Sequence, residues 1–302
     1  MVILETINIS KAYNNIPAVS NADLTVKQGE ITALIGENGA GKTTLMRIIT
    51  SLTKPDSGEV LLFGESAMAK KRMQMAKMGC LIEYPALYLN MSGEQNLEYY
   101  RIQRRIDNKN IVKESLKRVG LADTKAKRVK DYSLGMKQRL GIALAMLNKS
   151  ELLILDEPAN GLDPTGIIEM RELLKQLSNE GIGMLVSSHQ LTELAKVSDK
   201  FIFMHYGSIK RNVTKEQLFH ECSKFLLLEV DDAKKAEKAL IESLGLTQFE
   251  IHSPHEMRIN DKNIAPHEVV RVLVYAGVKV SSVTSEHSSL EDCYMKTIQG
   301  VY

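Results

Sequence analysis

Short apolar blocks alternate with amphipathic stretches over the greater part of the chain. Side chains alternate from Val2 to Asn8 as in a half-buried strand, and residues 22–26 form a second strand-like run that ends at Gly29. Each later apolar block is followed by a helical segment, giving strand 31–35 with helix 42–51, strand 152–155 with helix 166–178, and strand 184–187 with helix 191–197. Such βαβ units predict an α/β fold with a largely parallel sheet and ligands at the carboxyl ends of its strands.

The alternation of strands and helices changes after about residue 220, where the predicted order of elements becomes βαββαβα. The predicted elements are strand 224–230, helix 232–244, strand 247–252, strand 256–259, helix 265–276, strand 278–283 and a closing helix that starts at the capping box Ser288–Glu291. This order is typical of a small α+β, ferredoxin-like domain. We therefore expect two domains, residues 1–220 and residues 221–302.

Composition excludes several classes of protein. The 302 residues carry 39 Lys and Arg against 37 Asp and Glu, so a net charge of +2 gives no basic face for nucleic acid. The three cysteines, Cys80, Cys222 and Cys293, lack metal-ligand spacing and indicate a reducing compartment. No window approaches the roughly 18 apolar residues of a membrane span, and the first residues lack a basic signal-peptide region.

The strongest chemical signal is the segment 36–43, Gly-Glu-Asn-Gly-Ala-Gly-Lys-Thr, which fits GxxxxGK[ST] between a strand and a helix. Its glycines let backbone N–H groups turn toward phosphate oxygens, and the following helix adds its positive end. Lys42 would reach the β- and γ-phosphates, and the Thr43 hydroxyl would bind Mg²⁺. The residues expected to bind ATP here are Gly36, Asn38, Gly39, Ala40, Gly41, Lys42, Thr43 and Thr44.

A second signal is the apolar strand 152–155, which runs directly into Asp156 and Glu157. A strand that ends in two carboxylates is most often only solvated. Downstream of a phosphate-binding loop, however, Asp156 can orient Mg²⁺ and Glu157 can activate the attacking water as a general base.

Three further segments narrow the class: Tyr132–Arg139, Asn160–Asp163 and Ser187–His189. In this order and spacing they resemble the signature motif, D-loop and H-loop of the ATP-binding cassette (ABC) ATPases, over residues 1 to about 220. The resemblance implies an ABC ATPase domain with an antiparallel β part and a helical subdomain, and two cassettes that pair head to tail. By matching position, Ser133 and Gly135 would contact the γ-phosphate across the dimer, and His189 would contact it from the phosphate-loop side. Asp163 would belong to the D-loop, and Tyr13 would stack on adenine.

Two departures from the family pattern point to one branch. Leu134 and Met136 replace a Gly and the Gln of the usual signature, and Glu83 stands where most cassettes have a Gln beside the metal. With the Ser289–Asp292 ending, these departures resemble the bacitracin and lantibiotic branch of bacterial ABC ATPases. A carboxylate at Glu83 would add a third acidic group near Mg²⁺, tolerable mainly when the metal is bound.

The resemblance implies the ATP-hydrolysing subunit of a bacterial ABC transporter that exports or removes a membrane-active peptide such as bacitracin or a lantibiotic. Its partners would be a separate membrane permease and a second cassette, identical or not, with no nucleic acid. The segment 84–100 would receive a short permease helix, which would hold the otherwise cytoplasmic chain at the inner face of the membrane. The alternative is a permease-free cytosolic ABC ATPase that acts in the assembly of another complex. A chromosome-maintenance ATPase would need a long heptad insertion that is absent from the sequence.

Overall fold

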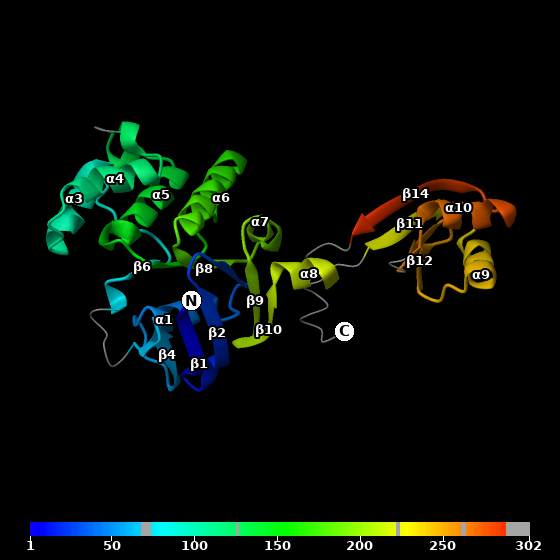
Figure 1. Ribbon diagram of the computed structural model, residues 1–302, viewed down its shortest axis with the longest axis horizontal. Helices are drawn as coiled ribbons and strands as arrows, with labels where there is room; N and C mark the ends of the chain where they lie inside the picture. Colours follow the sequence, from blue (N-terminus) through cyan, green and yellow to red (C-terminus); the bar gives the residue numbers. More distant parts are fainter. Residues whose placement is uncertain (68–73, 125–126, 222–223, 261–263, 288–302) are drawn as a thin grey trace. The chain divides into compact units, whose positions relative to one another are not determined.

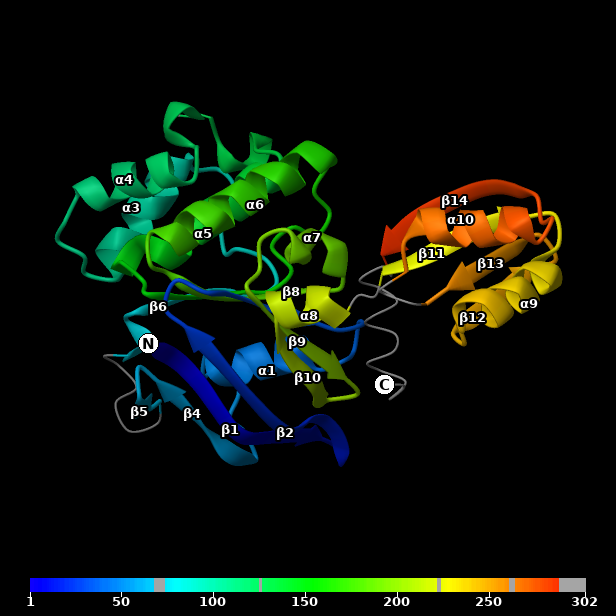
Figure 2. The same ribbon diagram turned by 45° about the vertical axis from the view of Figure 1, so that its right-hand side comes forward.

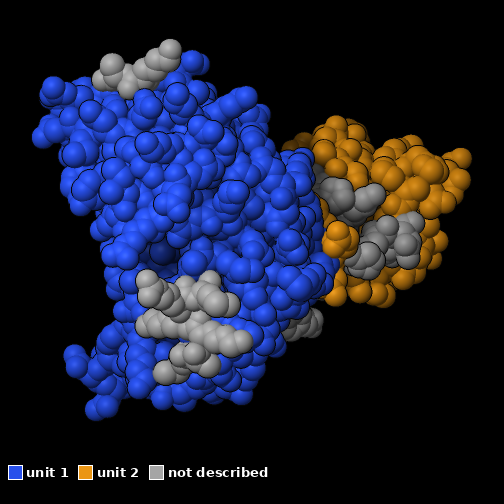
Figure 3. Space-filling view, turned by 60° about the vertical axis from the view of Figure 1, so that its left-hand side comes forward, with its two compact units in different colours: residues 1–215 blue, residues 216–302 orange. Residues whose placement is uncertain are grey.

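The computed structural model describes residues 1–67, 74–124, 127–221, 224–260 and 264–287. The chain divides into two compact units, residues 1–215 and residues 216–302 (Figure 3). The domain boundary expected from the sequence, between residues 220 and 221, falls at the end of helix α8 (Lys215–Glu221). The closing helix, its capping box and the Ser289–Asp292 ending lie outside the described residues.

The larger unit is built on a six-stranded sheet in the order β10-β9-β3-β8-β7-β6. The strands are β3 (Ile31–Ile35), β6 (Met78–Leu81), β7 (Leu152–Leu155), β8 (Gly183–Ser188), β9 (Lys200–His205) and β10 (Ser208–Thr214). All neighbours are parallel except β10, which is antiparallel to β9 at one edge. Every residue of β3 and β7 is buried, because the sheet is covered on both faces.

A second, antiparallel sheet has the order β2-β1-β4-β5. Its strands are β1 (Val2–Tyr13), β2 (Ile16–Lys27), β4 (Ser57–Leu62) and β5 (Glu65–Ser66). Helix α1 (Lys42–Ile49) lies between the two sheets (Figure 2). Its apolar residues Leu45, Met46, Ile48 and Ile49 share one core with side chains of both sheets. The antiparallel β part implied by the family resemblance is therefore present.

Three helices, α3 (Gly93–Gln103), α4 (Asn110–Arg118) and α5 (Leu134–Ala145), gather into a helical part (Figure 1). Helix α6 (Pro164–Asn179) turns a stripe of Met170, Leu173, Leu174 and Leu177 inward, at the spacing of one helix face. Helix α7 (Leu191–Ala195) follows β8. Among the described residues, no helix is both long and apolar enough to cross a membrane.

The smaller unit has the predicted order of elements βαββαβ. They are β11 (Lys224–Val230), α9 (Ala233–Leu244), β12 (Phe249–Ser253), β13 (Glu256–Ile259), α10 (Pro266–Tyr275) and β14 (Val280–His287). The strands form a small antiparallel sheet in the order β12-β13-β11-β14. Leu226, Leu228 and Val230 alternate along β11 into a core that α9 and α10 complete, so this unit has a core of its own.

Candidate nucleotide-binding site

The phosphate-binding loop joins β3 to α1, as the sequence predicts, and it is packed too closely for side chains at its two outer glycines. A Cβ at Gly36 would lie 2.4 Å from the carbonyl oxygen of Met204 in β9. A Cβ at Gly41 would lie 2.3 Å from the carbonyl oxygen of Ala18 in β2, and Gly41 has a φ of 102°. Glycine is therefore required at both positions, because the loop is wedged between the two sheets.

Lys42 begins α1 and is 6% exposed. Its Nζ donates to the carbonyl oxygens of Gly36 at 2.8 Å and Glu37 at 3.2 Å, and lies 3.5 Å from Oε1 of Glu157. The ammonium group is thus held at a cleft of about 300 Å³, where it can meet an anion. The residues that line this cleft are Ala18, Asn38, Gly39, Ala40, Gly41, Lys42, Thr43, Thr44, Glu157 and Asn160.

A buried hydrogen-bond network joins α1, β7 and β8. Asp156 follows β7, is 5% exposed, and accepts a hydrogen bond from the Thr43 hydroxyl at 2.8 Å. Its other carboxylate oxygen accepts from Ser187 Oγ at 2.5 Å, and the same Oγ accepts from the backbone N–H of Glu157 at 2.9 Å. Ser187 belongs to the segment that resembles the H-loop, but the sequence does not predict its contact with Asp156. The position of Ser187, a polar residue at the carboxyl end of a buried parallel strand, could have indicated that it belongs to the site.

Thr43 and Asp156 fit a magnesium site. They bring a hydroxyl and a carboxylate oxygen together at the mouth of the phosphate-binding loop, and hard oxygen donors are what Mg²⁺ takes. Mg²⁺ is commonly held by one or two carboxylates together with substrate phosphates. A complete protein cage is therefore not required, and the described residues contain no group of three or more His, Cys, Asp or Glu that could form one.

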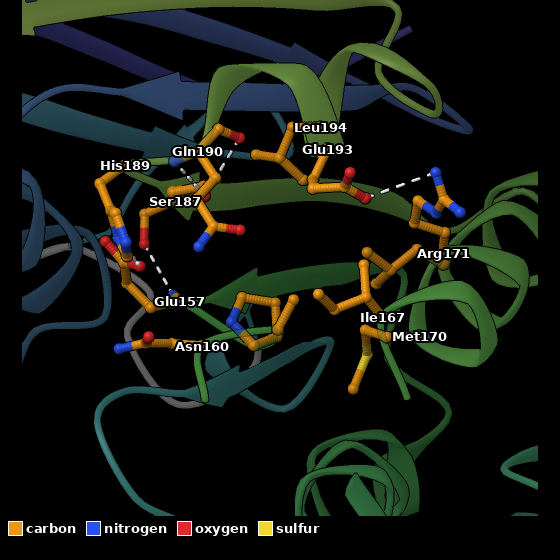
Figure 4. A pocket seen from close by; sticks show the side chains of 14 residues that line it. Glu157, Asn160, Ile167, Met170, Arg171, Ser187, His189, Gln190, Glu193 and Leu194 are labelled. Carbon is orange, nitrogen blue, oxygen red and sulfur yellow. Dashed lines mark hydrogen bonds and ion pairs between the residues drawn. The ribbon is translucent and has the colours of Figure 1, made fainter. Parts of the chain in front are cut away.

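Glu157 and His189 face each other from the ends of β7 and β8 (Figure 4). His189 Nδ1 lies 2.6 Å from Oε2 of Glu157, while the other carboxylate oxygen faces Lys42. Glu157 has a φ of 49°, a conformation that costs a non-glycine residue roughly 1–2 kcal/mol and is typical of functional sites. The arrangement presents a fixed carboxylate, suited to accept a proton, at the edge of the phosphate cleft.

The signature residues stand apart from this cleft, with Ser133 exposed and Gly135 half-buried. Ser133 precedes α5, and its hydroxyl accepts a hydrogen bond from the backbone N–H of Met136 at 3.2 Å. Neither Ser133 nor Gly135 lines the phosphate cleft of the same chain. Their predicted γ-phosphate contacts therefore require a second cassette.

The signature and the D-loop touch within one chain. Cδ2 of Leu134 would lie 3.1 Å from a Cβ placed on Gly161, and Cδ2 of Leu162 would lie 3.7 Å from a Cβ placed on Gly135. Asp163 caps α6 by accepting a hydrogen bond from the backbone N–H of Gly166 at 3.1 Å. The D-loop is thus fixed between the catalytic strand end and the signature helix.

Tyr13 and Glu83, two further predicted site residues, also do not line the cleft. Tyr13 ends β1 and is 46% exposed. Glu83 follows β6 in a left-handed conformation and forms an ion pair with Arg47 of α1. Sequence reasoning did not identify Arg47 as a partner. The roles of Tyr13 and Glu83 stay predictions.

Comparisons with known proteins agree with this geometry. A family profile described as "ABC transporter" matches residues 19–160. The chain is 38% identical over 299 residues to the bacitracin transport ATP-binding protein BcrA of Enterococcus faecalis, covering 99% of this chain and 97% of BcrA. It is 39% identical over 207 residues to the lantibiotic transport ATP-binding protein SrtF of Streptococcus pyogenes, covering 68% of this chain and 89% of SrtF.

Solved structures show the same fold. The ATP-binding subunit of an ABC transporter superposes with a TM-score of 0.64 at 27% identity, covering 72% of this chain and 92% of that one. CbiO1 of Clostridium perfringens, part of the transporter complex cbiONQ, superposes with a TM-score of 0.66 at 26% identity, covering 81% and 96%. The chain therefore belongs to the ATP-binding, ATP-hydrolysing subunits of ABC transporters.

Proposed function

We propose that this ATPase powers the export or removal of a membrane-active peptide, such as bacitracin or a lantibiotic, through a separate permease. The observation that carries the proposal is the match to BcrA, which extends over both units of the chain and is not confined to the ATPase core. The departures at Glu83, Leu134 and Met136 support the same branch.

In the proposed catalytic cycle, the loop 36–44 binds the phosphates of ATP and Lys42 neutralises their charge. Thr43 and Asp156 hold Mg²⁺, which would neutralise the developing charge on the phosphates. Glu157 accepts the proton of the attacking water, and His189 orients the Glu157 carboxylate and contacts the γ-phosphate. The contacts of Lys42, Thr43, Asp156 and His189 described above support these roles.

The active form is proposed to be a head-to-tail dimer of cassettes, identical or not. Ser133 and Gly135 would bind the γ-phosphate held by the partner's phosphate loop, and Asp163 would lie at the interface. Ser133 and Asp163 are exposed, and neither they nor Gly135 line the chain's own cleft, which supports this arrangement. ATP then closes the dimer because it contacts both cassettes only in the closed state.

The proposed permease surface is the segment 84–100. Large apolar side chains are exposed there, with Tyr84 at 82% and Leu89 at 52%, and Ile102, just beyond the segment in α3, is 60% exposed. A groove of about 1070 Å³ runs beside them between α3 and α4. The segment is firmly fixed, because Asn96 of α3 exchanges hydrogen bonds with the backbone of Tyr88. Clustered exposed apolar groups support a protein partner, which would hold the chain at the inner face of the membrane.

For the second unit, the proposed architecture is the ferredoxin-like one. The order of elements βαββαβ and the antiparallel strand order β12-β13-β11-β14 support it. The proposed domain boundary remains between residues 220 and 221. Every nucleotide-binding motif of the sequence lies before this boundary.

The test is expression of the chain together with its permease in a sensitive bacterium. The tolerated concentration of bacitracin or a lantibiotic should rise, and Lys42→Ala should abolish the gain because the phosphate-binding charge is lost. Co-purification of a polytopic membrane protein should accompany the gain. Unchanged tolerance to a panel of such peptides, with no secretion defect after deletion of the gene, would contradict the substrate and leave the ATPase assignment intact.

A further inference from the structure

The carboxylate of Asp56 binds the last residues of β1. Its Oδ1 lies 2.6 Å from the Lys11 ammonium, and its Oδ2 accepts a hydrogen bond from the backbone N–H of Ala12 at 2.8 Å. The backbone N–H of Asp56 also donates to the carbonyl oxygen of Ser10 at 2.9 Å. Three successive residues of β1 are therefore bonded to one aspartate, and the next residue is Tyr13.

The pairing of β1 with its neighbouring strands is irregular at this end, so other contacts must hold the strand in place. The pairing of β1 with β4 stops at Ser10, opposite Ser57. The pairing of β1 with β2 shifts register on both sides of Lys11. Irregular pairing leaves the strand end weakly defined by the ladder alone, so the contacts with Asp56 supply the missing constraint.

Lys11 connects Asp56 to the ring of Tyr13. Its Nζ lies over the ring, 5.6 Å from the centroid, which is within cation–π range. The ammonium lies over one face of the ring only, and Tyr13 is 46% exposed, so the residue is accessible to a planar ligand.

The hairpin that carries Tyr13 reaches the phosphate cleft. Tyr13 pairs with Ile16 across the turn, and Ala18, two residues further along β2, lines the cleft and crowds Gly41. The hairpin that carries Tyr13 near its tip therefore also contributes a residue to the site that would hold the phosphates.

We propose that Asp56 and Lys11 are positioning residues that fix the Tyr13 ring for stacking on the base of the bound nucleotide. The inference rests on the proposed nucleotide site, and it concerns binding of the base. A ring held in its bound orientation loses less conformational freedom when the base arrives. Hydrogen bonds from Lys11 and from Ala12 lower the pKa of the Asp56 carboxyl, so it is ionised throughout the neutral range.

The experiment compares a ligand that has a base with one that lacks it. Dissociation constants for ATP and for inorganic tripolyphosphate are measured by calorimetry on the full chain, for the wild type, Tyr13→Ala, Asp56→Ala and the double variant. Tyr13→Ala should weaken ATP binding by roughly 5- to 150-fold, the usual range for one stacked base. Asp56→Ala should weaken ATP by about three- to ten-fold, because the ring remains but is no longer held.

Tripolyphosphate should bind all variants equally, and the double variant should be no worse than Tyr13→Ala, because Asp56 acts only through the ring. Glu59→Ala, which removes an exposed carboxylate further along the same strand segment, is the matched control and should bind ATP normally. Lys11→Met should reproduce part of the Asp56→Ala loss, and it serves in place of Asp56→Ala if that variant fails to fold.

Several results would overturn the inference. They are an Asp56→Ala variant that binds ATP like the wild type, equal weakening of ATP and tripolyphosphate, and additive losses in the double variant. Normal ATP binding by Tyr13→Ala would also overturn it while leaving the phosphate site intact. If neither ligand binds the wild type, the proposed nucleotide site itself fails, which is a separate outcome.

Discussion

At the scale of single residues, the site depends on a few side chains that are each held by more than one partner. Glu157 is held by Lys42 and His189 through its carboxylate, and by Ser187 through its backbone N–H. Its left-handed backbone is strained, and these contacts are what maintain it. Such a residue is positioned before substrate arrives, which is expected of a catalytic base.

Glu157→Gln should therefore separate binding from hydrolysis. Glutamine has nearly the same shape and can still bond to His189, but it cannot take a proton from water. Steady-state ATPase should fall by about 10²–10⁴, the usual effect of losing a general base, while calorimetry should still detect ATP binding. Near-normal turnover at saturating Mg-ATP would exclude Glu157 from this role.

Glu83 offers a second prediction at this scale. Its partner Arg47 is 41% exposed and Glu83 is 56% exposed, so the ion pair is worth at most about 1 kcal/mol and can be broken. If the carboxylate also serves Mg²⁺, Glu83→Gln should raise the Mg²⁺ concentration needed for half-maximal ATPase. Arg47→Met, which frees the carboxylate, should lower it. Superimposable Mg²⁺ titrations for all three proteins would show that Glu83 acts only as the partner of Arg47.

At the scale of elements, the sequence predicts those strands and helices that a local pattern of residues marks. Strand β7 occupies residues 152–155 as expected, because a short apolar block that ends in two carboxylates is distinctive. The pair β9 and β10 was not predicted. Strand β9 does contain an apolar block, Phe201–Met204, but β10 at the edge of the sheet mixes apolar, basic and polar residues without a clear period. The ion pair of Glu83 with Arg47 joins residues far apart in the chain, so no local pattern could reveal it.

The contact of the phosphate loop with β9 leads to a prediction about packing. Gly36→Ala would place a methyl group against the Met204 carbonyl, and backbone on both sides must then move. Both ATP and tripolyphosphate should bind at least about tenfold more weakly, because the N–H groups of the loop no longer converge. Gly64→Ala is the control, because Gly64 has a φ of 77° and open space around it, so that variant carries backbone strain without a clash. Equal binding by both variants and the wild type would contradict the packing argument.

At the scale of the whole molecule, each unit has its own apolar core. One core is shared by both sheets and α1 of the larger unit, and the other lies between the four-stranded sheet and the helices α9 and α10. Every residue that lines the phosphate cleft belongs to the first unit. A unit with its own core can fold alone. We therefore expect the first unit to bind and hydrolyse ATP without the second.

A fragment of residues 1–220 should therefore bind ATP with a dissociation constant within about threefold of that of the full chain, because every residue that lines the cleft lies within it. An independent check keeps the chain whole: Leu240→Ala removes a fully buried side chain of α9 and should destabilise the second unit by about 2–5 kcal/mol. ATP binding by that variant should be unchanged, while its calorimetric melting should show an early transition. A folded fragment that fails to bind ATP, together with weakened binding in Leu240→Ala, would mean that the second unit helps to complete the nucleotide site.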